Sequence, residues 1–445
     1  SDMVLSINEL SVSKALGVLG LVIVTSCYIF PFEFKALPGF NTKMGIAALG
    51  LVCLFIELGK ARDALINRQI LNISVIALLV SLISLFSITL NNTSDISYAR
   101  YIVSIWVWLG GAYATVFLIQ KLHGGVSVIL VGNYLIATCV MQCILAIMID
   151  RIPFVFNIVN TYIGNFGVGG SAQGFAESGR LYGIGAAVDF AGTRFVPVLL
   201  IIAYVSVYLN TTTFRKYMTL YIVAFIVITF VGNMMSRTTT VGALMALAFW
   251  LYASASLRGR DGKGVIRLWK YLALLLAIVV PIIVVLYNTN DFVHEKVRFG
   301  FEGFFSLVES GHWQTNSNDI LKNMYRFPTT FKTWIIGDGY FDNPTDDPYY
   351  VGYQWKGFYM GTDVGYLRFI FYFGLIGLAA IVGFMAKATT ICMDRFEQYK
   401  KLFLLLLLAT FVIWFKVSTD LFPVLALFLM VKPEEDAAYM KRIAL

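Results

Sequence analysis

Charged residues are scarce in this chain: Asp, Glu, Lys and Arg make up 13% of its 445 residues, where a soluble domain carries about one quarter. Because 58% of the residues are hydrophobic, a water-soluble protein is excluded. Only three histidines and five cysteines occur. None of them has a zinc-site spacing, and no cysteine lies where a disulfide would be expected. We therefore predict neither a zinc centre nor a disulfide framework.

Long apolar runs dominate what is present. Since a bilayer core takes about 20 apolar residues per helix, the sequence predicts an all-α polytopic membrane protein with about 11 or 12 transmembrane helices. The runs lie at 13–32, 42–59, 70–90, 98–119, 126–149, 193–209, 217–235, 238–256, 268–287, 363–386 and 402–431. Lys416, Ser418 and Asp420 interrupt the last run, and a hairpin there favours twelve crossings. Residues 1–445 are thus expected to form one integral membrane domain.

Two polar stretches interrupt the apolar runs, a smaller one at 150–192 and a larger one at 288–361. The net charge of +8 comes from short basic clusters in alternate loops, which is the pattern of loops that stay in the cytoplasm. Acids outnumber bases in the larger polar stretch. Both polar stretches are therefore predicted to face outward, and the charge indicates orientation rather than nucleic-acid binding.

Three arginines lie at the predicted outer edge of the membrane: Arg180, Arg194 and Arg237. An ionised side chain at this depth costs a few kcal/mol unless it is paired or hydrated. Each could simply reach the lipid headgroups as an anchor. Because all three lie on one side, converging guanidinium groups that bind a phosphate or diphosphate are the functional alternative.

The larger loop is rich in aromatic residues set among Asn, Gln and Asp, a mixture that offers the flat apolar faces and hydrogen-bonding edges that sugars require. They are Trp313, Tyr325, Trp334, Tyr340, Tyr349, Tyr350, Tyr353, Trp355 and Tyr359. A small packed domain with aromatics in its core is the alternative. The acids Asp342, Asp346 and Asp347 are more typical of a solvated loop than of a metal site.

Asp363 stands where the larger loop enters the run at 363–386. A carboxylate there can cap the helix. In a partly dehydrated vestibule it can also accept a proton from a sugar hydroxyl. Capping and catalysis are both open at this point.

Three short motifs complete the pattern: Arg180-Leu-Tyr-Gly183, Ser236-Arg237-Thr238 and Gly337-Asp338-Gly339. In order and placement they resemble the Arg-x-x-Gly, Ser-Arg-Thr and Gly-x-Gly of the bacterial O-antigen polymerase and O-antigen ligase superfamily. Members of that superfamily are membrane glycosyltransferases that use polyprenyl-diphosphate-linked glycans. The resemblance covers the layout of the whole chain.

One departure separates the two branches of the superfamily. Ligases typically carry, at the end of the large loop, His followed by Asn, Ser or Gln, then nine residues, then Gly-x-x-Gly. This chain has Asp363-Val364, nine residues, then Gly374-Leu-Ile-Gly377. The missing histidine favours a polymerase.

The resemblance implies a glycosyltransferase-C-like fold in a bacterial inner membrane, with the partly helical large loop in the periplasm. It implies transfer of a growing glycan from undecaprenyl diphosphate to the terminal sugar of a new lipid-linked repeat unit, without a metal ion or other cofactor. Asp363 would be the base. The implied substrate-binding residues are Arg180, Tyr182, Gly183, Arg194, Ser236, Arg237, Asp338 and Tyr340.

The implied partners are the lipid-linked oligosaccharide, membrane lipids, a chain-length co-polymerase and a flippase, with no nucleic acid. A ligase or related glycan transferase is the nearest alternative function, and a flippase or transporter without chemistry is the more distant one. The sugars, the linkage and the stereochemistry of transfer stay open.

Overall fold

The computed structural model describes residues 12–60, 64–165, 175, 178–208, 212–256, 260–344 and 357–444. Among them, nine helices are long and apolar enough to cross a membrane, which confirms the predicted helical, multi-pass architecture. They are α1 (Val12–Ile29), α3 (Ala64–Leu90), α4 (Tyr101–His123), α5 (Val128–Arg151), α8 (Val188–Tyr208), α9 (Thr212–Met235), α10 (Thr239–Ser256), α11 (Arg260–Thr289) and α16 (Gly365–Arg395). Each coincides with one of the predicted runs.

The remaining apolar runs form shorter helices. Helix α2 (Thr42–Lys60) packs along α4, and the last run divides into α17 (Lys400–Ile413) and α18 (Phe422–Leu429). Arg395, at the end of α16, donates to the carbonyl of Leu429, at the end of α18. Helix α18 therefore returns to the side where α17 begins, as a hairpin requires. The count of twelve crossings stays a prediction.

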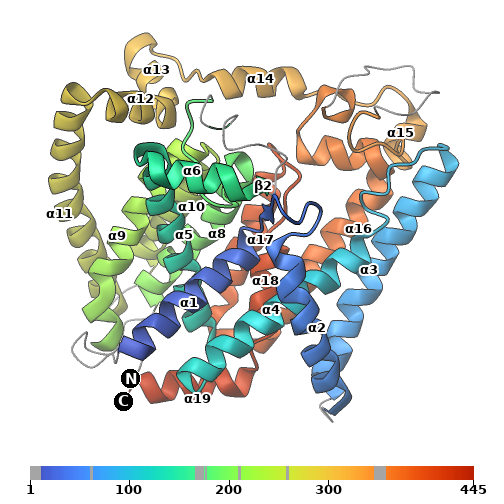
Figure 1. Cartoon of the computed structure of the whole chain (residues 1–445), viewed down its shortest axis with the longest axis horizontal. Helices are drawn as coiled ribbons and strands as arrows, with labels where there is room; N and C mark the ends of the chain where they lie inside the picture. The colour runs from blue at the N-terminus through green and yellow to red at the C-terminus, as the bar shows by residue number, and fades with distance from the viewer. Residues whose placement is uncertain are drawn as a thin grey trace.

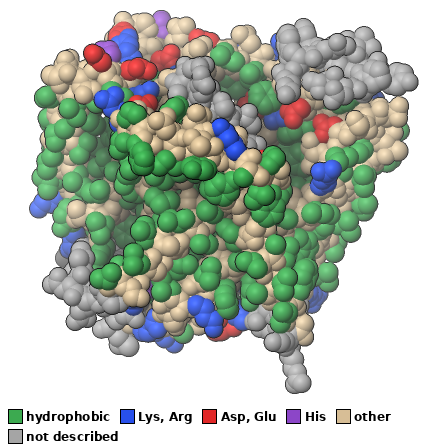
Figure 2. Space-filling model, in the orientation of Figure 1, with side chains coloured by type: hydrophobic (Ala, Val, Ile, Leu, Met, Phe, Trp, Pro, Cys, Tyr) green, Lys and Arg blue, Asp and Glu red, His purple; other side chains and the backbone are tan. Residues whose placement is uncertain are grey.

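Short elements gather at one end of the molecule, which we call the loop face (top of Figure 1). They are α6 (Pro153–Tyr162), α12 (Asp291–Gly300), α13 (Glu302–Ser310), α14 (Asn316–Met324), α15 (Phe331–Ile335), the turn η1 (Tyr359–Gly361) and the two-stranded ribbon of β1 (Glu33–Phe34) and β2 (Ile163–Asn165). At the other end lie η2 (Glu397–Tyr399) and α19 (Pro433–Ala444). Figure 2 shows a broad apolar band between the two charged ends, as a surface in contact with lipid requires.

Helix α8 is the centre of the bundle. Every residue from 191 to 207 is buried, whereas α11, at the left edge of Figure 1, exposes most of its apolar side chains. A helix that is apolar all round must be surrounded by protein or lipid. Polar side chains at the loop-face end of α8 are therefore enclosed by neighbouring helices, and they need partners there.

Helix α16 is broken at Phe373 and Gly374, where Gly374 adopts a positive φ of 69°. A Cβ at Gly374 would lie 2.1 Å from the carbonyl oxygen of Ile335, so the end of α15 packs on bare backbone. The break frees two carbonyls of α16, those of Phe371 and Tyr372. They accept hydrogen bonds from the backbone N–H groups of Asp338 (2.6 Å) and Gly339 (3.0 Å). The Gly-x-Gly motif is thus a backbone joint between the large loop and α16.

Candidate functional site

A cavity of about 170 Å³ lies at the loop face beneath α14. We call it the Arg237 cavity, and it is lined by Arg180, Asp189, Arg237, Ser317, Ile320, Leu321, Met324, Asp363 and Lys416. These residues come from six separate segments of the chain. The structure therefore brings together three of the residues that the sequence singled out, Arg180, Arg237 and Asp363. Their catalytic roles stay predictions.

The Ser-Arg-Thr motif forms the tight turn between α9 and α10. The hydroxyls of Ser236 and Thr238 donate to Oδ1 of Asp189, over 3.3 and 2.6 Å, in the first turn of α8. Lys416 places its Nζ 2.8 Å from the same oxygen. Because Asp189 binds the residues on both sides of Arg237, the turn is held against α8 and the guanidinium is aimed into the cavity.

Arg237 is the point where three helices of the large loop converge. Its guanidinium pairs with Glu302 of α13 at 2.6 Å and donates to Oγ of Ser317 on α14 at 2.9 Å. It also donates to the carbonyl of Phe299 on α12 at 3.2 Å and lies 4.4 Å from the centre of that residue's ring. Burial lowers the pKa of Arg237 from its usual value, and the Glu302 carboxylate opposes that shift. The side chain remains a cation with a fixed direction.

Arg180 lies over the same ring, with its guanidinium carbon 5.2 Å from the ring centre of Phe299. Its loop is anchored by backbone: Leu181 donates to the carbonyl of Met234 at 3.1 Å, and Lys296 donates to that of Gly179 at 2.8 Å. Within the described residues, the Arg180 guanidinium makes no ion pair. Two neighbouring guanidinium groups, one without a counter-ion, favour an anion between them.

Tyr182 and Gly183 support the Arg180 loop from below and do not line the cavity. Tyr182 is buried and packs on Phe175, with ring centres 5.4 Å apart. A Cβ at Gly183 would lie 2.1 Å from Oε1 of Gln142. That oxygen accepts the N–H of Ile184 at 2.9 Å, so the glycine allows the amide of Gln142 to hold the loop.

Asp363 reaches the cavity from the chain just before α16. The N-cap position of α16 is occupied by Val364, so the predicted capping role of Asp363 is wrong. The carboxylate is 21% exposed and lies 3.6 Å from Nη1 of Arg368. Burial raises the pKa of Asp363 to about 7, while Arg368 acts in the opposite direction. A carboxylate with this pKa can take up a proton at neutral pH.

Arg368 is a residue whose place in the site the sequence did not predict. It pairs with Asp342 at 2.6 Å and donates to the carbonyl of Phe341 at 3.1 Å and to Oγ of Ser418 at 3.4 Å. Asp189 and Lys416 were also missed. Lys416 carried a signal, since it interrupts an apolar run. Asp189 was missed because the whole stretch at 150–192 was assigned to a loop, although the neighbours of Asp189, Ala187, Val188, Phe190 and Ala191, are apolar.

Of the eight predicted substrate-binding residues, only Arg180 and Arg237 line the Arg237 cavity; Ser236 supports it from the turn, and Asp338, Tyr340 and Arg194 lie elsewhere. Asp338 accepts hydrogen bonds from Lys332 (3.2 Å), Thr333 (2.8 Å) and Tyr359 (3.3 Å), all within the large loop. Tyr340 packs on Tyr359, with ring centres 5.3 Å apart. Arg194 lines a second cavity, of about 720 Å³. Of the predicted acidic cluster, Asp346 and Asp347 lie outside the described residues.

Comparison with protein-family models, with curated proteins and with solved structures finds no match to this chain. The chemistry of the site must therefore be read from its own residues.

Proposed function

We propose that the protein is a membrane glycosyltransferase that polymerises a bacterial surface polysaccharide. It transfers a growing glycan from undecaprenyl diphosphate to the terminal sugar of a new lipid-linked repeat unit. The observation that carries the proposal is the Arg237 cavity, which joins Arg180, Arg237, Lys416 and Asp363 at the loop face of a helical membrane bundle. Such a cavity supplies both an anion-binding side and a proton acceptor.

The arginine side of the cavity suits the departing diphosphate. Guanidinium groups bind phosphate oxygens through paired N–H donors, and fixed donors stabilise charge as it develops. Arg237 is held by Glu302 and Ser317, whereas Arg180 has no ion partner in the described residues. The positive charge of Arg180 is thus available to the diphosphate of the donor, and the guanidinium of Arg237 is held in a fixed orientation.

Asp363 suits the acceptor. The acceptor hydroxyl oxygen forms a bond to the anomeric carbon of the donor, and the bond from that carbon to the diphosphate oxygen breaks. The diphosphate leaves with the bonding electrons, and the hydroxyl proton passes to Asp363. A pKa raised to about 7 gives the carboxylate enough basicity for this transfer while leaving much of it ionised at neutral pH.

The large loop suits the exclusion of water. Helix α14 covers the cavity with Ile320, Leu321 and Met324, and Ser317 ties the helix to Arg237. Water that reached the donor would hydrolyse it, so a helix that covers the cavity with its apolar side protects the transfer. The reaction would take place at the periplasmic surface of the inner membrane, because the basic loops of the opposite end are expected to face the cytoplasm.

Reconstitution with purified lipid-linked repeat units tests the proposal. We expect ladders of polymer from the native chain, with EDTA present or absent, and none from Arg180→Ala or Arg237→Ala. Lys322→Ala is the matched control, because Lys322 is a 73% exposed cation on α14 that pairs only with Asp319. Polymer from both arginine variants, or a requirement for a metal ion, would contradict the mechanism.

A ligase would use the same donor, so the acceptor decides between the two. In cells that lack a polymerase, single repeat units are still attached to the surface but long polymer is missing. In cells that lack a ligase, all attached glycan is missing. We expect the first result when the gene is deleted.

A further inference from the structure

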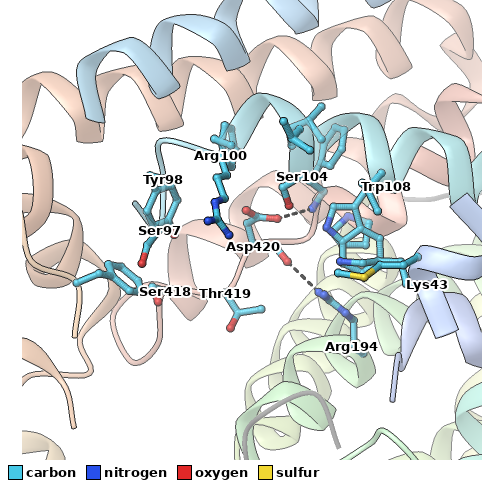
Figure 3. A pocket seen from close by; sticks show the side chains of 18 of the residues that line it. Lys43, Ser97, Tyr98, Arg100, Ser104, Trp108, Arg194, Ser418, Thr419 and Asp420 are labelled. Atoms are coloured by element: carbon cyan, nitrogen blue, oxygen red, sulfur yellow. Dashed lines mark hydrogen bonds between the residues drawn. The ribbon is translucent and has the colours of Figure 1, made fainter. Parts of the chain in front are cut away.

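The second cavity, which we call the Arg194 cavity, holds about 720 Å³ between the starts of α2 and α4, the loop-face half of α8 and residues 418–423. Figure 3 shows Arg100 and Arg194 directed toward Asp420 from opposite sides, with Lys43 beside Trp108. The chain is not α-helical at residues 414–421, and Ser418, Thr419 and Asp420 of this segment line the cavity. Irregular backbone at membrane depth is tolerated where it borders a polar cavity, so a hydrated, ligand-sized space fits this segment.

The cations of the Arg194 cavity have few partners. Arg194 is 3% exposed, donates through Nη1 to the backbone carbonyl of Asp420 at 2.9 Å, and has no acceptor for its Nε. Lys43 lies 4.0 Å from the ring centre of Trp108, and neither it nor Arg100 makes an ion pair within the described residues. The lining therefore has three cations without a carboxylate partner.

The acids of the lining do not balance these cations. Asp342 is taken by Arg368 at 2.6 Å. Asp420 accepts the N–H of Phe422 at 3.0 Å through Oδ1, which leaves its second oxygen toward the cavity. Three cations against the single carboxylate of Asp420 leave an excess of two positive charges, so a ligand that carries negative charge is favoured.

The other lining groups are those that bind a sugar ring. The indole of Trp108 offers a flat apolar face. Hydroxyls stand around the cavity on Ser97, Ser104, Ser418 and Thr419. The free oxygen of Asp420 can accept a sugar hydroxyl. An isolated diphosphate would accept hydrogen bonds from the hydroxyls, but it would leave the indole face of Trp108 unused and would meet the Asp420 charge.

The two cavities adjoin. Lys416 lines the Arg237 cavity and Ser418 lines the Arg194 cavity, so two residues of extended chain, at most about 7 Å, separate them. Arg368 bridges the same gap, 3.6 Å from Asp363 and 3.4 Å from Ser418. A sugar in the Arg194 cavity would therefore be next to the proposed base.

We propose that the Arg194 cavity binds a carboxylate-bearing sugar of the acceptor glycan, with Arg100, Arg194 and Lys43 facing its carboxylate and Trp108 facing its ring. The repeat unit would accordingly contain an acidic sugar. The identification of this sugar as part of the acceptor rests on the proposed function. The binding of an acidic sugar does not depend on it.

Saturation-transfer NMR on the purified full-length chain in detergent tests the binding. The probes are methyl β-D-glucuronide and its uncharged analogue, methyl β-D-glucoside. We expect the glucuronide to bind and the glucoside to give little signal. Arg100→Gln and Lys43→Gln should each weaken glucuronide binding by about tenfold, the loss of one charge-assisted hydrogen bond. Arg298→Gln, an exposed arginine paired with Glu309, and Arg180→Gln should not weaken it.

Three results would overturn the proposal: no binding of the glucuronide, equal binding of the glucoside, or unchanged binding in Arg100→Gln and Lys43→Gln. Displacement of the glucuronide by inorganic pyrophosphate in the Arg180→Gln background would also overturn it, because it would assign the cavity to a phosphate group. Arg180→Gln changes the Arg237 cavity and not the Arg194 cavity. Polymer synthesis by this variant therefore tests the proposed function, whereas its glucuronide binding tests the Arg194 cavity, so that the two proposals can fail separately.

Discussion

Two polar cavities of the loop face, the Arg237 cavity and the Arg194 cavity, differ in how their charged side chains are paired. In the Arg237 cavity, Arg237 pairs with Glu302, Lys416 with Asp189 and Asp363 with Arg368, and in the part of the chain that the structure describes Arg180 has no ion partner. In the Arg194 cavity, Lys43, Arg100 and Arg194 have none within the described residues. The smaller cavity is thus charged but fixed, and the larger one is charged and open.

This difference indicates a division of work. Ion pairs and hydrogen bonds that already exist hold side chains in one geometry, which is what transition-state stabilisation needs. A cation without a counter-ion can form an ion pair with a negatively charged ligand, and no existing pair has to be broken. The fixed cavity is suited to chemistry and the open one to recognition.

The sharpest way to test the contrast is Arg180→Ala. We expect kcat to fall by about 10²–10³-fold, the cost of losing one donor to developing charge, while the melting temperature in detergent stays the same because no ion pair is broken. The measurement is polymer formed from saturating lipid-linked substrate, alongside thermal unfolding. A large drop in melting temperature with unchanged kcat would make Arg180 a structural residue.

Asp363→Asn should give the next largest loss of activity, and the pH dependence of kcat/KM tests its cause. Because the base must be ionised, kcat/KM of the native enzyme should rise about tenfold per unit below pH 7 and level off above it. In Asp363→Asn the activity should fall by about 10²-fold, the contribution of a general base. A native profile that is flat between pH 5 and 8 would remove Asp363 from the chemistry.

The same carboxyl has an effect of definite sign on stability. Between its ordinary pKa and about 7, folded Asp363 holds a proton that the unfolded chain has released, so its contribution to stability declines as pH rises through this window. Asp363→Asn should therefore lose less stability than the native chain between pH 5 and 8. Thermal unfolding at the two pH values measures it, and an equal loss in both proteins would contradict the raised pKa.

Asp189→Ala probes the fixed pairing of the smaller cavity. It leaves Lys416 without its partner and Ser236 and Thr238 without their acceptor. We expect a loss of about 2 kcal/mol, less than for a fully buried pair because both side chains are partly exposed. A double variant, Asp189→Ala with Lys416→Met, should regain part of it. If the single variant unfolds like the native chain, the pair is not structural.

Arg100→Gln should have the smallest effect on stability, within about 0.5 kcal/mol, since no carboxylate among the described residues pairs with Arg100. Its effect should appear in the acceptor KM, raised by about tenfold, with kcat changed far less. Acceptor titrations and thermal unfolding measure the two quantities. A strong loss of stability would show that the larger cavity is held together by the charges we assign to recognition.

Much of the bundle follows from the sequence, because about 20 apolar residues in a row have few alternatives to a membrane helix. Arg180 and Arg237 were also predictable, since an arginine at the edge of a helix must find a partner or water. Asp189 and Lys416 were not. Their role comes from a contact between residues 227 positions apart, which no local pattern encodes.

Arg194 illustrates how a small error of boundary changes a role. The sixth run was predicted to begin at 193, which placed Arg194 at the membrane edge beside the other arginines. Helix α8 begins at Val188 instead, so Arg194 lies six residues after the first residue of the helix, about 9 Å along the axis. The first turn of the helix was assigned to the polar stretch that precedes it. Arg194 consequently lines the Arg194 cavity and not the cavity that Arg180 and Arg237 share.

The hydrogen bonds that Asp338 and Gly339 make across the break in α16 join the extramembrane polypeptide to the helix that follows Asp363. The large loop is consequently joined, at the break beside Gly374, to the same helix that Asp363 precedes. Exchanging the loop for one of another specificity would thus require exchanging the matching face of the helix as well.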